Sequence, residues 1–157
     1  MEEKREIIQK KVYDENGKIK YVIIPNYTKT SNLMTLSELR YYKFLVRVVT
    51  EIREKTGQRL EIFPQVATNR IIRQNNRREK ELDKDIFGTS IDYVIYNKDK
   101  DEIHCCIELD GNEHQTDPSR IKRDKIINEA FKDNIKLIRQ NTQESYSIEE
   151  TIKKILN

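Results

Sequence analysis

Two β-rich segments in the middle of the chain constrain its fold more than any other feature. They are "SIDYVIYN", residues 90–97, and "EIHCCIELD", residues 102–110, and the polar tetrapeptide "KDKD" separates them. Runs of β-branched and aromatic residues that are bounded by a polar turn are typical of strands. The two segments are therefore expected to pair as an antiparallel hairpin.

Helices are expected on both sides of this hairpin in the sequence. Over residues 35–55, apolar side chains recur every three or four positions, and Thr35 and Glu38 form a capping-box pair. Asp117 followed by a proline predicts the start of a second helix, which runs to about residue 132. The other predicted elements are strands over 59–67 and 135–140 and a final helix that starts after Ser147.

Residues 10–27 form a separate pattern near the start of the chain. Two segments in which polar and apolar residues alternate flank "ENGK", and Asn-Gly is a strong signal for a two-stranded hairpin. We therefore expect a hairpin appendage over residues 1–32 and a main α/β domain over residues 33–157.

The composition narrows the class of protein. Charged residues make up 36% of the chain and no apolar run exceeds four residues, whereas a membrane span needs about 20. Neither a membrane span nor a signal-peptide core is expected. Cys105 and Cys106 are adjacent on an expected strand, where neighbours point to opposite faces, which argues against a disulfide framework and a cysteine zinc site. A cytoplasmic protein is expected.

Positive charge is concentrated in two segments, although the net charge is only +3. The first is "RIIRQNNRREK", residues 70–80, and the second is "RIKRDK", residues 120–125. Each segment is either a solvated surface or a contact for the phosphates of a nucleic acid. The candidate residues for nucleic-acid contact are Arg70, Arg73, Arg77, Arg78, Gln115, Arg120 and Arg123.

Acidic residues gather on one face of the expected central hairpin. If its turn is centred near residue 100, Asp92 faces Glu108, and Asp110 adds a third carboxylate to that face. Like charges that are directly opposed destabilise a hairpin. Either a divalent cation such as Mg²⁺ or Mn²⁺ compensates this repulsion, or the carboxylates are solvated on an open face of the sheet.

The order of these motifs resembles that of a known superfamily. Its elements are Glu38 on a first helix, "IDY" at residues 91–93, "IELDG" at residues 107–111, His114, "RD" at residues 123–124 and "LIR" at residues 137–139. Together they resemble the PD-(D/E)XK nucleases, and most closely the very-short-patch-repair-endonuclease-like branch. The resemblance implies a restriction-endonuclease-like fold, in which helices flank a mixed sheet with a central antiparallel hairpin.

The resemblance also implies a function and a set of site residues. The implied activity is that of a magnesium- or manganese-dependent DNA endonuclease in DNA repair, mobile-element processing or defence. The implied metal ligands are Asp92, Glu108, the Leu109 carbonyl and Asp110. The implied catalytic residues are Glu38, Asp92, Glu108, Asp110, His114 and Lys122.

One position departs from the wider superfamily pattern. The residue two after the motif's glutamate is usually lysine, and here it is Asp110. The lysine polarises the attacking water and stabilises charge on the phosphate. His114, Gln115, Lys122 and Arg123 are the candidates to take over this task, and His114 is favoured because a neutral imidazole accepts a proton near pH 7.

Two alternatives to an active nuclease stay open. The first is a nuclease-like domain that binds DNA without cleaving it, because Asp110 replaces the lysine. The second is an interaction domain whose acidic cluster is solvated. For an active enzyme, a partner protein or a homodimer is expected, since a domain of this size offers little surface for reading bases.

Overall fold

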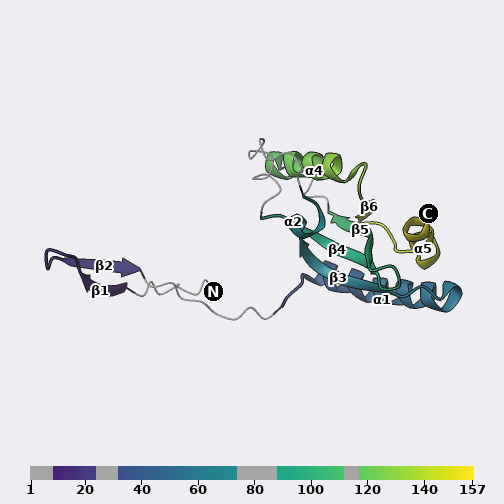
Figure 1. Ribbon diagram of the computed structural model, residues 1–157, viewed down its shortest axis with the longest axis horizontal. Coiled ribbons are helices and arrows are strands. Elements are labelled where there is room, and N and C mark those ends of the chain that lie inside the picture. The colour runs from purple at the N-terminus through teal and green to yellow at the C-terminus, as the bar shows by residue number, and fades with distance from the viewer. Residues whose placement is uncertain (1–8, 24–31, 74–87, 112–116) are drawn as a thin grey trace. The chain divides into compact units, whose positions relative to one another are not determined.

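The structure is a computed structural model that describes residues 9–23, 32–73, 88–111 and 117–157 (Figure 1). The chain divides into two compact units, Met1–Leu33 and Met34–Asn157, with a boundary one residue from the predicted one. In the first unit, β1 (Gln9–Tyr13) and β2 (Ile19–Ile23) pair as an antiparallel hairpin, as predicted. Gly17 adopts a φ of +73° in its turn, a conformation that glycine accommodates without strain.

A four-stranded mixed sheet forms the centre of the second unit, in the order β3-β4-β5-β6. The strands are β3 (Leu60–Ala67), β4 (Ser90–Asn97), β5 (Glu102–Asp110) and β6 (Leu137–Asn141). β4 pairs antiparallel with β3 and β5, whereas β6 runs parallel to β5. The predicted fold class is therefore confirmed: the central antiparallel hairpin lies within a mixed sheet that helices flank.

Four helices surround this sheet in the described part of the chain. They are α1 (Leu36–Thr56), α2 (Thr68–Ile71), α4 (Pro118–Phe131) and α5 (Ile148–Leu156). The predicted caps are present: Thr35 and Glu38 form the capping box of α1, and Asp117 and Ser147 cap α4 and α5. Each cap satisfies backbone N–H groups that have no partner within the helix.

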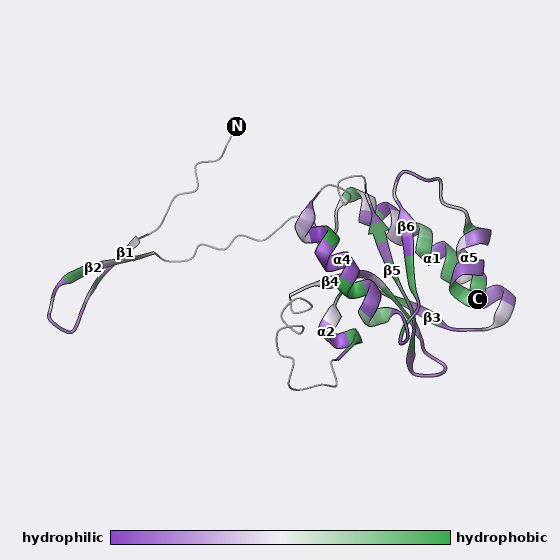
Figure 2. Ribbon diagram, turned by 90° about the horizontal axis from the view of Figure 1, so that it is seen from above, coloured by the Kyte–Doolittle hydropathy of each residue, from purple (hydrophilic) through white to green (hydrophobic). Residues whose placement is uncertain are grey.

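The helices bury apolar side chains against both faces of the sheet. Leu45 of α1 and Ile155 of α5 belong to one buried cluster, whereas Ile71 of α2 and Phe131 of α4 belong to another. Cys105, Cys106 and Ile107 alternate between the two clusters along β5, so the clusters lie on opposite faces. Figure 2 shows apolar residues, in green, along β5 and on the helices beside it.

The two cysteines are core residues. Both side chains are fully buried, and burial raises the pKa of each thiol to about 12. Because the thiolate is the nucleophile, neither residue is suited to catalysis, and both serve as small apolar side chains of the core.

An extra residue in β5 sets the register of the central hairpin. Asn97 pairs with Glu102 next to the turn, but beyond Ile95 the register shifts by one residue, and His104 is left without a partner in β4. Such a β-bulge points two consecutive side chains, here His104 and Cys105, in similar directions. The His104 Nε2 atom lies 2.9 Å from the carbonyl oxygen of Ile155. Simple alternation along β5 would place His104 on the face of Cys106, but the bulge turns it towards α5 instead.

Candidate active site

The central hairpin opens at the end where the predicted acidic residues lie. The β4–β5 ladder ends at the pair Tyr93 and Ile107, and the same register places Asp92 opposite Glu108. Without the bulge, Asp92 would face Ile107 instead. Beyond the ladder, the Leu109 N–H donates to Asp92 Oδ2 at 2.8 Å. An acidic side chain thus takes the place of a backbone acceptor where the two strands part.

Glu108 is a buried carboxyl group, with 3% of its surface exposed. Burial and, to a smaller extent, the neighbouring Asp92 carboxylate raise its pKa to about 8, against the opposing effects of Arg123 and Arg139. A buried carboxylate beside a second carboxylate is unfavourable unless a cation compensates it. The opposed carboxylates predicted from the sequence therefore do meet in the folded chain.

Arg123 on α4 brings positive charge to this pair. Its Nη2 atom lies 3.3 Å from Glu108 Oε1 and donates to the Ser90 carbonyl at 2.7 Å. The second guanidinium nitrogen contacts Asp124 at 3.4 Å. Because three partners hold the guanidinium, its charge is fixed next to the Glu108 carboxyl group.

Gln65 connects Glu38 to Asp92. The Gln65 amide donates to Glu38 Oε1 at 2.7 Å and lies 3.4 Å from Asp92 Oδ1. Glu38 also accepts from the Thr35 N–H through Oε2, as the capping box requires. The Tyr93 hydroxyl donates to the Glu38 carbonyl at 2.5 Å and holds the start of α1 against the sheet. Glu38 therefore caps α1 and is also linked to Asp92 through a single side chain, that of Gln65.

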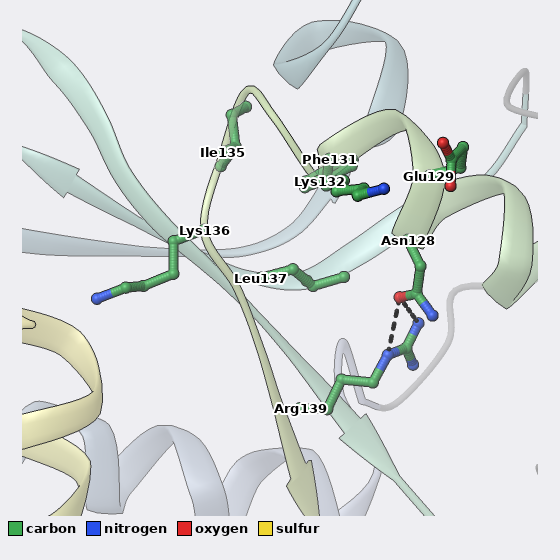
Figure 3. A pocket seen from close by; sticks show the side chains of 8 residues that line it. All are labelled: Asn128, Glu129, Phe131, Lys132, Ile135, Lys136, Leu137 and Arg139. Carbon is green, nitrogen blue, oxygen red and sulfur yellow. Dashed lines mark hydrogen bonds between the residues drawn. The ribbon is translucent and has the colours of Figure 1, made fainter.

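Asp110, Arg139 and Asn128 form a second group of polar side chains on the β6 side of β5, and Asp124 joins this group to Arg123. Arg139 Nη1 contacts Asp110 Oδ1 at 2.9 Å, and its Nη2 lies 3.4 Å from Asp124 Oδ1. Arg139 also donates twice to the Asn128 amide oxygen, as the dashed lines in Figure 3 show. The Asp110 carboxylate is thus compensated by an arginine rather than directed at Asp92.

A pocket of about 630 Å³ lies beside this group, between α4 and β6 (Figure 3). Two of its basic side chains already have partners within the chain. Arg139 contacts Asp110 and Asp124, and the Lys136 ammonium group donates to the carbonyls of Lys154 and Ile155 at the end of α5. Lys132 and Glu129 add one charge of each sign to its lining, which does not extend to the acidic pair.

The other predicted site residues fall into two groups. The first group is exposed and consists of Arg70, Arg73, Arg120 and Lys122. These residues lie on or next to α2 and α4, and both helices pack on the face of the sheet that bears Cys106. Glu108 lies on that same face by alternation. The remaining candidates lie outside the described residues: Arg77, Arg78, His114 and Gln115.

The oxygen atoms around Asp92 and Glu108 suit a hard divalent cation. No group of three or more His, Cys, Asp and Glu side chains in the described ranges is arranged to hold a metal. Magnesium, however, needs only one or two carboxylates besides water and substrate oxygens. The Leu109 carbonyl points to the β4 side, because the N–H and C=O of one strand residue face the same neighbour. Two carboxylates and one carbonyl therefore fit such a cation, and Asp110 is not part of this set.

Sequence reasoning missed several residues of the site. Gln65 and Ser90 carry no motif, and Arg139 was noted only as the end of a strand motif. Arg139 lies in register with Glu108 on the parallel strand β6, and its side chain reaches Asp110, which the strand motif did not indicate. No signal identifies Gln65, whose position depends on an irregularity of β3.

Comparisons with known proteins give one match. Residues 30–157 match the model of a family described as a protein of unknown function, DUF2726. Neither the curated proteins nor the solved structures contain a significant match. Among the described residues, no helix is long and apolar enough to cross a membrane.

Proposed function

The chain belongs to the DUF2726 family, and we propose that its second unit is a metal-dependent endonuclease that hydrolyses the phosphodiester bonds of DNA. The observation that carries this proposal is the contact between Asp92 and the buried Glu108 at the open end of the β4–β5 ladder. Without a bound cation this arrangement costs folding free energy, because it buries one acidic group beside another and Arg123 offsets only part of that cost.

Asp92, Glu108 and the Leu109 carbonyl would hold the cation. When bound, the cation supplies positive charge to the scissile phosphate and lowers the pKa of a water molecule. Gln65 and the Leu109 N–H orient the Asp92 carboxylate. Arg123 places a fixed positive charge beside Glu108, where it would oppose the negative charge that develops on the phosphate.

Arg123 thus takes over part of the task of the missing lysine. Asp110 stands at the lysine's usual position, and its carboxylate forms an ion pair with Arg139. Among the candidates for this task, Arg123 contacts Glu108, whereas Lys122 is exposed on the same helix. The role of His114 stays a prediction.

Exposed basic residues support DNA as the substrate. Arg70, Arg73, Arg120 and Lys122 belong to or follow the helical segments on the Glu108 face of the sheet. Phosphate contacts from such residues position a duplex without reading its sequence. A partner protein or a second copy would then supply any selectivity for sequence or for a DNA structure.

Nicking of a supercoiled plasmid tests this proposal. Wild-type protein should produce open-circular DNA with Mn²⁺ or Mg²⁺ and none with EDTA. Asp92→Asn should produce none under either condition, because the amide keeps the shape of the side chain but removes the charge that the cation needs. If the wild type cleaves no supercoiled, linear, mismatched or single-stranded DNA with either metal, the enzyme proposal fails.

One observation favours a second candidate function, a nuclease-like module that binds DNA without cleaving it. Arg123 contacts Glu108, and Arg139 contacts Asp110, so arginines already compensate two of the carboxylates. Tight DNA binding by the wild type without metal-dependent nicking would support this module instead.

A further inference from the structure

Gln65 adopts an unusual backbone conformation next to the candidate site. Its φ is +53°, in the left-handed region that only glycine and, less often, asparagine and aspartate visit readily. Pro64 pairs with Tyr93 and Val66 pairs with Ile91, and no ladder pair joins Gln65 itself to β4. Continuing the register places Gln65 opposite Asp92. Strain of this kind persists only where the surrounding structure enforces it, and it is concentrated at functional sites.

The contacts of the Gln65 amide explain what this conformation achieves. Its nitrogen donates to Glu38 Oε1 and lies near Asp92 Oδ1, and its oxygen accepts from the Ser90 hydroxyl at 3.0 Å. Only the NH₂ end of an amide can face two carboxylates, so these three contacts also fix which way the amide points. The contact with Asp92 is long at 3.4 Å, and therefore Glu38 and Ser90 are the anchors that hold the amide in place.

A neutral amide is well suited to this position. A lysine here would compensate Asp92 and compete with a cation, whereas a glutamate would add a third negative charge. The Gln65 amide restrains Asp92 from the β3 side without changing its charge, and the Leu109 N–H restrains it from the β5 side.

We infer that Gln65 is a positioning residue, which uses Glu38 and Ser90 as anchors to fix the Asp92 carboxylate in the orientation that a divalent cation requires. This inference rests on the proposed function for the role of the cation. The orientation of Asp92 itself can be measured without any metal, because the Leu109 N–H reports on it. Groups behind metal ligands typically contribute about 10- to 100-fold to metal affinity or activity.

The test uses the full chain with Gln65→Met, which keeps the length of the side chain but removes its polar contacts. In metal-free protein, hydrogen exchange of the Leu109 amide should be roughly 10-fold faster than in wild type, because Asp92 no longer accepts from it in a fixed geometry. Mn²⁺ affinity should fall by about 10- to 100-fold. In the cleavage assay, kcat should fall while KM for DNA stays unchanged.

Ser90→Ala and Asp101→Gly complete the set. Ser90→Ala removes one anchor of Gln65 and should shift Leu109 exchange and Mn²⁺ affinity in the same direction, by less. Asp101, with a φ of +56°, has the other positive φ among the described non-glycine residues, and Asp101→Gly should change neither quantity, which controls for a substitution at a positive-φ position outside the site.

The outcomes separate the two claims. Unchanged Leu109 exchange in Gln65→Met overturns the inference, whatever the enzyme activity. If exchange responds but the wild type neither binds Mn²⁺ nor cleaves DNA, the proposed function fails, while Gln65 keeps its role in orienting Asp92 and loses its role towards a cation.

Discussion

Replacing Glu108 by Gln should reduce metal-dependent cleavage by roughly 100-fold or more, since charge stabilisation by a bound cation contributes several kcal/mol. The substitution preserves the shape of a side chain that is buried beside Asp92 and removes one of the two charges that would hold the cation. The rate of plasmid nicking at saturating Mn²⁺ measures this effect. Glu102→Gln, at the exposed start of β5, is the matched control and should cleave as fast as wild type.

The same variant should change how stability depends on pH in the metal-free protein. The pKa of Glu108 is raised from 4.5 to about 8. Between these values the folded protein holds a proton that the unfolded chain releases. The contribution of Glu108 to the free energy of unfolding is therefore fully present below pH 4.5 and is lost as the pH rises towards 8. Glu108→Gln lacks this dependence.

Thermal unfolding in EDTA at several pH values measures the difference. Relative to wild type, Glu108→Gln should gain in melting temperature as the pH rises from about 5 to 8. If the difference in melting temperature between Glu108→Gln and wild type stays constant over this range, and the variant cleaves normally, burial does not raise the pKa of Glu108 and Glu108 is not part of the site.

Replacing Arg123 by Ala should lower kcat by roughly 100- to 1000-fold, which is the typical effect of removing one group that stabilises transition-state charge. Arg123 contacts Glu108 and the Ser90 carbonyl, and its charge lowers the pKa of Glu108. The variant should therefore raise this pKa further. Steady-state cleavage kinetics, with kcat and KM determined separately, measure the effect.

Lys125→Ala is the control for Arg123. Lys125 is exposed on the same helix, so its loss removes one positive charge without disturbing Glu108. Equal rates for the two variants would assign Arg123 to general attraction of DNA rather than to the site. Arg123→Lys should recover only part of the activity, because an ammonium group cannot reproduce the geometry of a guanidinium.

Local sequence signals predicted most of the fold correctly. The capping pair of Thr35 and Glu38, the N-cap Asp117 and the two central strands are all where the sequence indicated. These features depend on neighbours within four residues or on simple alternation, and both can be read from a single sequence. The opposition of Asp92 and Glu108 was predicted from a turn centred near residue 100, whereas the folded chain reaches this register through a bulge.

The features that position the site depend on irregular backbone, which residue types do not reveal. The turn alone would place Asp92 opposite Ile107, and the bulge at His104 supplies the extra residue that brings Glu108 into register. Gln65 likewise adopts a positive φ that its residue type disfavours. Arg123 was expected either to contact DNA or to take over the lysine's task, and residue type alone did not indicate that its guanidinium group contacts Glu108 within the chain.

A calorimetric titration of the metal-free wild-type protein with Mn²⁺ tests most directly whether the opposed carboxylates of Asp92 and Glu108 form a cation site. The wild type should bind Mn²⁺ saturably at one or two ions per chain, and release protons as it does so, because Glu108 with its raised pKa must ionise to bind the cation. Asp92→Asn and Glu108→Gln should each abolish this binding. Absence of saturable binding in the wild type, or binding that persists unchanged in both variants, would contradict a cation site at Asp92 and Glu108.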